Sequence, residues 1–245
     1  MGKNGRLRVA TYNVHKCKGM DGRTRPARVA RVIAELDADV IALQEVLSAP
    51  GAPEDDQARY LAQALEPRYH YGLGENRKHR GAAYGNAVLS RFPILVTRNY
   101  DITRSGRERR GCMRVDLRLG AGLLHVFNVH LGTGFFERRY QGDLLVSREI
   151  LIDPELRAPR IVLGDFNEWT RGLATRLLGA AFDEVDLRKY VKRRRTYPGI
   201  LPLLHLDHIY YERGLRLLDF RVHRSRLALL ASDHLPLVAD FELPG

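Results

Sequence analysis

Two side chains that could do chemistry, Asp165 and Asn167, follow the short apolar run Ile161–Leu163 at a spacing of two residues. The apolar run is typical of a buried strand, and residues two apart on an extended chain point to the same side. A carboxylate and a carboxamide that project together can hold a water molecule, a phosphate oxygen or a hard metal ion. The same Asp-x-Asn pattern at a strand end is also typical of a turn or a helix cap, so that alternative stays open.

Five further segments place polar side chains at the ends of apolar runs. Three of these side chains, Asn13, Glu45 and Asp233, carry oxygens of the kind that Mg²⁺ prefers, and Asp165 and Asn167 add to the same donor set. No set of Cys and His residues has the spacing of a zinc site. The five segments are Leu7–Val14, Asp39–Val46, Phe127–Leu131, Leu206–Tyr210 and Ser232–Leu237.

Taken together and in this order, the six motifs resemble the endonuclease/exonuclease/phosphatase superfamily. Its members include pancreatic-type DNases, abasic-site endonucleases, sphingomyelinases and inositol-phosphate phosphatases. The matching segments run from residue 7 to residue 241, so the resemblance covers nearly the whole chain. It implies an α/β (α+β) fold, a four-layer α/β/β/α sandwich in which two β-sheets pack face to face with helices outside.

The resemblance also assigns roles to the oxygen-bearing residues. Glu45 matches the main metal carboxylate of the family, and Asn13 lies beside it as a metal ligand or a phosphate contact. Asp165 and Asn167 match the pair that positions the attacking water and a phosphate oxygen. Asp233 matches an acidic residue that holds metal directly or through water. The implied cofactor is Mg²⁺ or Mn²⁺.

Two histidines match catalytic positions of the family. His234 matches the catalytic histidine and Asp207 its carboxylate partner, which would raise the pKa of the imidazole and fix its tautomer. His130 matches the second histidine of the DNase and sphingomyelinase branch, where it would protonate the leaving oxygen or steady the phosphate. The carboxylate that pairs with this histidine in secreted DNases is not identified, because Glu75 and Glu108 both fit.

The chain also departs from the family pattern near Asn13. His15 stands where several branches have an acidic residue, so it either replaces a second metal ligand or caps the strand. The segment His15–Gly19 would form a basic lip over the phosphate site or only a tight turn, and Cys17 within it is either oxidation-sensitive or a packed thiol. His15, Asn86 and Arg110 are expected to contact the substrate.

Positive charge is unevenly distributed along the chain. The formal net charge is +11 and the isoelectric point is near 9.9, so the surface should attract polyanions. The alternative is a solvated basic face without a partner. Two clusters in expected loops carry much of the excess: Arg104, Arg107, Arg109, Arg110 and Arg114 form one, and Lys189, Lys192, Arg193, Arg194 and Arg195 form the other.

The hydrophobic pattern alternates between helices and strands. Pro26 marks the first turn of a helix, and further helices are expected at Asp55–Leu65, Phe136–Ile152 and Gly172–Leu178. Periodicity alone supports a mixed α/β layered domain. Beyond the segments named above, strands are expected at Ala87–Ser90, Ile94–Tyr100, Met113–Leu119, Leu123–His130, Leu206–Tyr211, Leu215–His223 and Leu235–Phe241.

Composition bounds the class of protein. The 245 residues, 44% of them hydrophobic, suit one domain spanning residues 1–245. No run of eighteen apolar residues predicts a membrane span, and two cysteines argue against a secreted disulfide framework. The N-terminus lacks the apolar core of a signal peptide, so a cytoplasmic location is expected. The protein is also expected to be a monomer.

The sequence therefore predicts a metal-dependent phosphoesterase in which water attacks phosphorus in line. Either Asp165 or His234 would take the proton from that water. The basic surface favours a nuclease or other phosphodiesterase that acts on DNA. A sphingomyelinase-like phosphodiesterase of phospholipid head groups is the alternative, because anionic membranes attract the same basic patches. A non-catalytic nucleic-acid-binding domain is the third reading, disfavoured because every expected site residue is present.

Overall fold

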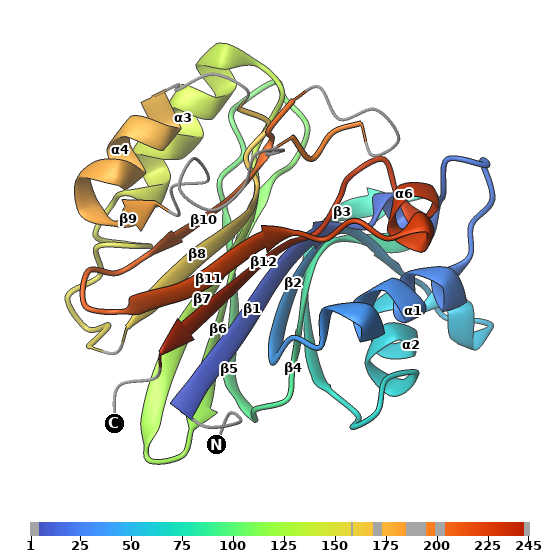
Figure 1. The fold of residues 1–245 in the computed structure, drawn as a ribbon. Helices are drawn as coiled ribbons and strands as arrows, with labels where there is room; N and C mark the ends of the chain where they lie inside the picture. Colours follow the sequence, from blue (N-terminus) through green and yellow to red (C-terminus); the bar gives the residue numbers. More distant parts are fainter. Residues whose placement is uncertain (1–4, 158, 169–172, 185–194, 199–203, 243–245) are drawn as a thin grey trace.

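Two six-stranded β-sheets pack face to face and carry helices on their outer surfaces (Figure 1). The computed structural model describes residues 5–157, 159–168, 173–184, 195–198 and 204–242. The helices lie on the two outer sides of the paired sheets, which gives the four-layer α/β/β/α sandwich that the sequence predicted.

The first sheet joins the two ends of the chain. Strands β1 and β2 run parallel at its centre, and its other neighbouring pairs are antiparallel. In spatial order the sheet contains β11 (Arg216–Val222), β12 (Leu237–Glu242), β1 (Arg6–Asn13), β2 (Val40–Ser48), β4 (Ala82–Ser90) and β3 (His70–His79).

The second sheet comes from the middle of the chain. Strands β7 and β8 are parallel, and the remaining pairs are antiparallel. In spatial order it contains β5 (Ile94–Asp101), β6 (Gly111–Leu119), β7 (Gly122–His130), β8 (Arg160–Asp165), β10 (Asp207–Tyr211) and β9 (Asp183–Glu184).

Each outer surface carries its own helices. Helices α1 (Pro26–Leu36), α2 (Gln57–Gln63) and α6 (Arg226–Ala231) lie beside the first sheet, and α3 (Phe135–Leu145) and α4 (Leu173–Ala181) beside the second. Two short 3-10 turns, η2 (His15–Cys17) and η3 (Pro53–Asp55), follow β1 and β2. Among the described residues, no helix has both the length and the apolar character needed to cross a membrane.

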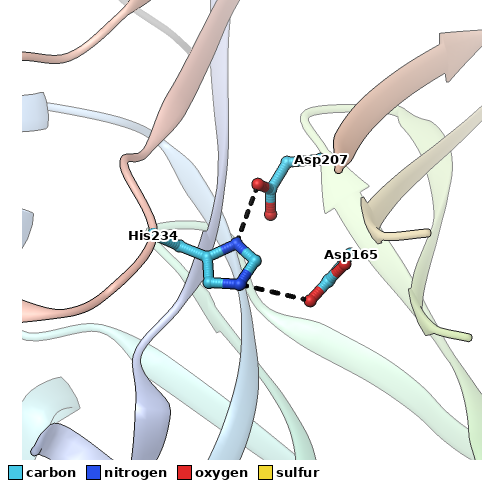
Figure 2. Close-up of side chains that lie close together, drawn as sticks. All are labelled: Asp165, Asp207 and His234. Carbon is cyan, nitrogen blue, oxygen red and sulfur yellow. Dashed lines mark hydrogen bonds and ion pairs between the residues drawn. The ribbon is translucent and has the colours of Figure 1, made fainter. Parts of the chain in front are cut away.

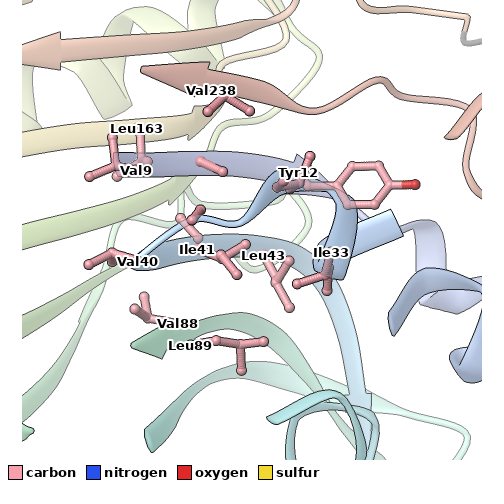
Figure 3. Packing of buried hydrophobic residues seen from close by; sticks show 14 of the residues in the cluster. Val9, Tyr12, Ile33, Val40, Ile41, Leu43, Val88, Leu89, Leu163 and Val238 are labelled. Carbon is pink, nitrogen blue, oxygen red and sulfur yellow. The ribbon is translucent and has the colours of Figure 1, made fainter. Parts of the chain in front are cut away.

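Buried apolar side chains hold these layers together in two clusters. The larger one fills the space between the sheets and continues under α1 (Figure 3). Its members Val9, Ile41, Val88 and Leu163 are all fully buried. A second cluster lies between the second sheet and helices α3 and α4. Burial of this kind contributes about 25 cal/mol for each Å² of apolar surface removed from water, so it is the main source of stability.

Several elements differ from the prediction. Helix α3 ends at Leu145, and the predicted continuation to Ile152 is wrong because residues 146–152 form turns. Strand β4 starts at Ala82, five residues before the predicted Ala87. Strand β3 and helix α6 were not predicted. β3 is an edge strand with mostly polar, half-buried or exposed side chains, so it lacks an apolar run, and α6 is only six residues long.

Candidate active site

The ends of three neighbouring strands of the second sheet bring three predicted residues into one row. His130 ends β7 and is paired with Asp165 at the end of β8, and Asp165 is paired in turn with Asp207 at the start of β10. Adjacent strands lie about 4.8 Å apart, so side chains in one row of a sheet can meet. All three residues are at least 97% buried, with exposed fractions of 3%, 1% and 0%.

A β-bulge aims Glu45 at the same place from the first sheet. The register between β2 and β4 shifts between Leu43 and Val46, and Glu45 has a φ of 58°, which is in the left-handed region. Bulges redirect side chains, and a left-handed backbone is strained for a residue other than glycine, so the surrounding sheet must hold it. The bulge brings the Glu45 carboxylate beside Asn13, which ends the neighbouring strand β1.

The amide of Asn13 joins the carboxylates of the two sheets. Its Nδ2 donates to Glu45 Oε1 at 3.2 Å and to Asp165 Oδ2 at 3.0 Å, while its Oδ1 accepts from the backbone N of His15 at 3.0 Å. Placed in this way, Asn13 holds two carboxylates together. An amide rotated by 180° would present its oxygen to an ion, so a metal-ligand role for Asn13 stays a prediction.

His234 lies between two carboxylates (Figure 2). Its Nδ1 is 2.9 Å from Asp207 Oδ2, and its Nε2 is 3.6 Å from Asp165 Oδ2. Burial of the ring lowers the pKa of His234, but the charges of Asp207 and Asp165 outweigh burial and raise that pKa to about 10. The structure therefore brings together the predicted His234–Asp207 pair, with the imidazole in its cationic form at neutral pH.

Two residues around this pair were missed by the sequence analysis. Thr196 Oγ1 donates to Asp207 Oδ2 at 2.6 Å, and the ring of Tyr197 lies 5.0 Å from the ring of His234, centroid to centroid. Ser232 Oγ donates to the backbone O of Asn13 at 2.7 Å, which ties the segment that carries His234 to β1. The Thr196-Tyr197-Pro198 sequence has no local pattern that would signal these contacts.

Asp165 and Asn167 are arranged differently from the prediction. Asn167 has a φ of 48°, so the chain is not extended there, and the expectation that both side chains point the same way along a strand is wrong. The backbone N of Asn167 donates to Asp165 Oδ1 at 2.9 Å, which is the turn that the sequence left open as the alternative. The Asn167 amide donates to the backbone O of Leu131 at 2.9 Å, so it ties the end of β8 to the residue after His130.

His130 approaches the same oxygen of Asp165 as His234 does, but its ring environment differs from that of His234. His130 Nε2 lies 3.7 Å from Asp165 Oδ2, while its Nδ1 is 3.3 Å from Nη1 of Arg110. Neither predicted carboxylate partner contacts it: Glu75 pairs with Lys78, and Glu108 pairs with Arg77 and Arg110. Burial and the charge of Arg110 lower the pKa of His130 to about 4, so this imidazole is neutral at neutral pH.

The donor set around Glu45 fits a divalent cation. Lys16 Nζ lies 2.6 Å from Glu45 Oε2, so a positive group already neutralises this carboxylate. Burial raises the pKa of Glu45, but the nearby His130 ring, the Lys16 ammonium and the hydrogen bonds from Lys16 and Asn13 outweigh burial and hold that pKa below its usual range. An ionised carboxylate beside carboxamide and further carboxylate oxygens is the ligand chemistry that Mg²⁺ and Mn²⁺ prefer.

A second group of possible metal ligands consists of Asp165, Asp207 and His234, and a protonated histidine fits this group better than a bound metal does. Candidate ligand atoms of Asp165, Asp207 and His234 lie within 4.8 Å of one another. The imidazolium of His234 stands between both carboxylates in this group and neutralises their charge, so a further cation would have to displace it. The metal site at Glu45 therefore stays a prediction, in which the cation would displace Lys16 from the carboxylate.

Lys16 gives the first testable prediction. Replacing it in the variant Lys16→Met removes a positive charge that competes for Glu45, so Mg²⁺ and Mn²⁺ should bind about tenfold more tightly, as measured by isothermal titration calorimetry. Lys18→Met is the matched control, because Lys18 is exposed two residues away. Unchanged or weaker metal binding by Lys16→Met would contradict the competition.

His15 and Asp233 lie at the edge of this cluster. His15 Nδ1 is 3.4 Å from Asp233 Oδ1, and the two side chains remain 32% and 24% exposed. Residues His15, Lys16 and Cys17 all have positive φ values, so the segment after Asn13 is a tight turn that also brings Lys16 over the site. Cys17 is fully buried and burial raises the pKa of its thiol, which supports the packed-thiol alternative.

Buried amides brace the two sheets behind the site. Gln44 Nε2 donates to Asn128 Oδ1 at 2.8 Å across the interface between the sheets, and Asn128 Nδ2 donates to the backbone O of Leu43 and of Ala87. Asn86 donates to the backbone O of Asn128 and of Gly111, and it is fully buried. Asn86 thus links β4 to β6 and β7, and its substrate contact stays a prediction.

Four residues of the first basic cluster lie on the loop between β5 and β6, which reaches the site, but Arg114 lies on β6 itself, so its predicted loop position is wrong. Arg107 and Arg109 are exposed on this loop, whereas Arg110 is buried against His130 and Arg114 pairs with Asp116 at 2.7 Å. Of the second cluster only Arg195, which is exposed, lies among the described residues. The others, Lys189, Lys192, Arg193 and Arg194, lie outside them.

Comparisons with known proteins identify the family and the fold of the chain. The model of the Endonuclease/Exonuclease/phosphatase family matches residues 10–234. The protein YbhP of Escherichia coli strain K12 is 31% identical over 253 residues, which cover 97% of this chain and 96% of YbhP. A crystal structure of an endonuclease/exonuclease/phosphatase from Beutenbergia cavernae has a TM-score of 0.77 at 24% identity and covers 98% of this chain, which matches 72% of that one. A mannosyl-6-phosphatase from Bacteroides thetaiotaomicron has a TM-score of 0.77 at 18% identity, covering 96% of this chain and 99% of its own.

Proposed function

Because the chain belongs to the endonuclease/exonuclease/phosphatase family, whose members hydrolyse phosphate esters, we propose that it is a Mg²⁺- or Mn²⁺-dependent phosphodiesterase that acts on DNA as a nuclease. The observation that carries this proposal is the convergence of two imidazoles on one buried carboxylate oxygen, Oδ2 of Asp165. Asn13 links that carboxylate to Glu45, so the proton-transfer groups and the metal carboxylate form one site.

Four residues of the candidate site, Asp165, His234, Asp207 and Asn167, have defined tasks in the proposed hydrolysis. Asp165 orients the attacking water and accepts its proton, because His234 is already protonated and cannot accept another. The imidazolium of His234, held by Asp207, stabilises the negative charge that develops on the phosphoryl oxygens. Asn167 ties the loop after β7 to the end of β8 and so keeps His130 and Asp165 in register.

Glu45 would hold the metal, with Asp233 beside it as a direct or water-mediated ligand and Asn13 in its rotated form. When bound there, a divalent cation offsets the negative charge of the phosphate and of the leaving oxygen.

Positive charge beside the site supports a polyanionic substrate. Arg107 and Arg109 are exposed on the loop whose last residue, Arg110, reaches His130, so a phosphate chain that occupies the site would pass near them. Among the described residues, neither arginine has an ion pair recorded with a carboxylate. Arginines in this position can bind phosphates along a DNA strand.

The salt dependence of DNA binding tests this arrangement. In the double variant Arg107→Ala, Arg109→Ala, the slope of log K against log salt concentration should fall in magnitude by roughly 1.8 for duplex DNA, because each lost phosphate contact releases about 0.9 fewer counterions. Fluorescence anisotropy over a salt series measures this slope. The matched control is Arg68→Ala, Arg118→Ala, since both residues are exposed at the opposite end of the sheets. Equal slopes for both double variants would place Arg107 and Arg109 outside the DNA path.

One observation favours phospholipid as an alternative substrate. Phe135 and Phe136, five and six residues after His130, are 57% and 66% exposed, and Tyr140 on the same helix is 43% exposed. Exposed aromatic side chains next to a basic surface are also typical of proteins that bind anionic membranes. Assays of plasmid DNA, oligonucleotides and mixed-phospholipid vesicles with Mg²⁺ or Mn²⁺ separate the two. We expect cleavage of DNA. Hydrolysis of vesicle lipid without cleavage of DNA would instead identify lipid as the substrate.

A further inference from the structure

The contact between Arg110 and His130 is buried and geometrically defined. Nη1 of Arg110 lies 3.3 Å from Nδ1 of His130, and the two side chains are only 7% and 3% exposed. The other imidazole of the site has a carboxylate, Asp207, at the equivalent ring nitrogen. The two histidines therefore have opposite partners at Nδ1, although both turn Nε2 towards Asp165.

Arg110 is held in place from several directions, so the contact follows from the fold. Its Nη2 donates to Glu108 Oε2 at 3.0 Å, and Glu108 also pairs with Arg77 Nη2 on β3 at 2.7 Å. Its backbone N donates to Thr103 Oγ1 at 3.0 Å, which closes the loop between β5 and β6. These bonds orient the guanidinium before any substrate binds.

The chemistry of the guanidinium decides where the His130 proton lies. A guanidinium has only donor groups and stays protonated in proteins, so its hydrogen bond to Nδ1 requires that Nδ1 carry no proton. We propose that Arg110 is a positioning residue that fixes His130 as the neutral tautomer with its proton on Nε2. In that form His130 donates a hydrogen bond to a phosphoryl oxygen and does not protonate the leaving oxygen. The hydrogen bond to a phosphoryl oxygen rests on the proposed function, whereas the assignment of the tautomer does not depend on it.

The surrounding charges agree with this tautomer. The groups that act on His130 are Arg110 and His234, which disfavour a positive charge on it, and Asp165 and Glu45, which favour one. Burial acts in the same direction as Arg110, and the resulting pKa of about 4 leaves the ring neutral at neutral pH. Asp165 Oδ2 lies 3.7 Å from Nε2 and would accept the proposed proton's hydrogen bond until a phosphate oxygen takes its place.

Nitrogen-15 NMR of the metal-free protein tests the tautomer without substrate. In wild-type protein, Nδ1 of His130 should have the chemical shift of an unprotonated ring nitrogen and Nε2 that of a protonated one, with the signals assigned by their loss in His130→Gln. In Arg110→Met both neutral tautomers of His130 should be populated, one with the proton on Nδ1 and one with it on Nε2. The titration midpoint of His130 should rise by at least about one pH unit. Arg110→Lys retains a charged donor and should keep the wild-type pattern more closely than Arg110→Met.

Two outcomes would overturn the proposal: a protonated Nδ1 in the wild-type protein, or unchanged His130 signals in a folded Arg110→Met variant. If Arg110→Met does not fold, the wild-type spectrum alone decides the tautomer.

A kinetic comparison tests the consequence for catalysis. The loss in kcat caused by His130→Ala should be the same for a diester with a nitrophenyl leaving group and for a dinucleotide with an alkoxide leaving group. A much larger loss on the dinucleotide would show that His130 donates a proton to the leaving oxygen and would overturn this part. The NMR measurement needs neither metal nor turnover. If the protein is inactive, the proposed function is refuted, and the NMR spectrum still decides the tautomer of His130.

Discussion

Replacing His234 by alanine is expected to lower kcat by roughly 10²–10⁴, the range for a positioned proton-transfer or charge-stabilising group. Its Nδ1 is 2.9 Å from Asp207 and its Nε2 is 3.6 Å from Asp165, so the variant removes the cation between two buried carboxylates. Steady-state kinetics with a soluble phosphodiester measure the loss. Because Asp207 acts through the imidazole, adding Asp207→Asn to His234→Ala should cost little more.

A second buried histidine provides the matched control for this prediction. His125 Nδ1 lies 2.6 Å from Asp116 Oδ1, and His125 is on β7 near the end of the strand opposite to His130. His125→Ala removes a similar histidine–carboxylate pair far from the site, so any loss of stability should leave kcat per folded molecule near the wild-type value. Additive losses for His234 and Asp207, or an equal loss for His125→Ala, would contradict a catalytic His234–Asp207 unit.

Replacing Glu45 by glutamine should abolish tight metal binding while the protein still folds. The Glu45 carboxylate is the main proposed ligand, so Mg²⁺ and Mn²⁺ affinity should fall at least about 100-fold, beyond the usual cost of losing a residue that only orients a ligand. Glutamine keeps the shape of the side chain and can still accept from Asn13 and Lys16, so the loss in unfolding free energy should stay within about 2 kcal/mol.

Calorimetric titration with metal and thermal unfolding of the same samples separate these two effects. Glu242→Gln is the control, because Glu242 is a surface carboxylate that also pairs with a basic residue, Arg216. Wild-type metal affinity in Glu45→Gln would show that Glu45 is not a metal ligand. A variant that fails to fold would show that the role of Glu45 is structural.

The parts of the fold that the sequence could predict are those with strong local signals. Apolar runs that end in polar residues identified the strands that carry Asn13, Glu45, His130 and Asp165, because a buried strand needs such a run. Pro26 correctly marked the first turn of α1, since proline lacks an amide hydrogen that this position does not need.

Other features depend on contacts that no local pattern reports. The bulge at Glu45 and the left-handed conformation of Asn167 arise from strand register and turn formation, so reasoning from an extended chain could not find them. Arg110 was selected as a substrate contact because of its charge. Its contact with His130 depends on the pairing of β6 with β7 and on a loop closed by Thr103, which are properties of the folded chain.

The central claim, that this site hydrolyses phosphodiesters with a divalent metal, is tested most directly by the rate of DNA cleavage before and after metal removal. Purified protein with Mg²⁺ or Mn²⁺ should cleave DNA, EDTA should abolish the cleavage, and added Mg²⁺ or Mn²⁺ should restore it, because the cation proposed at Glu45 offsets the negative charge of the phosphate and of the leaving oxygen. Full turnover in metal-free protein, or no hydrolysis of any phosphodiester by the metal-loaded protein, would contradict the claim.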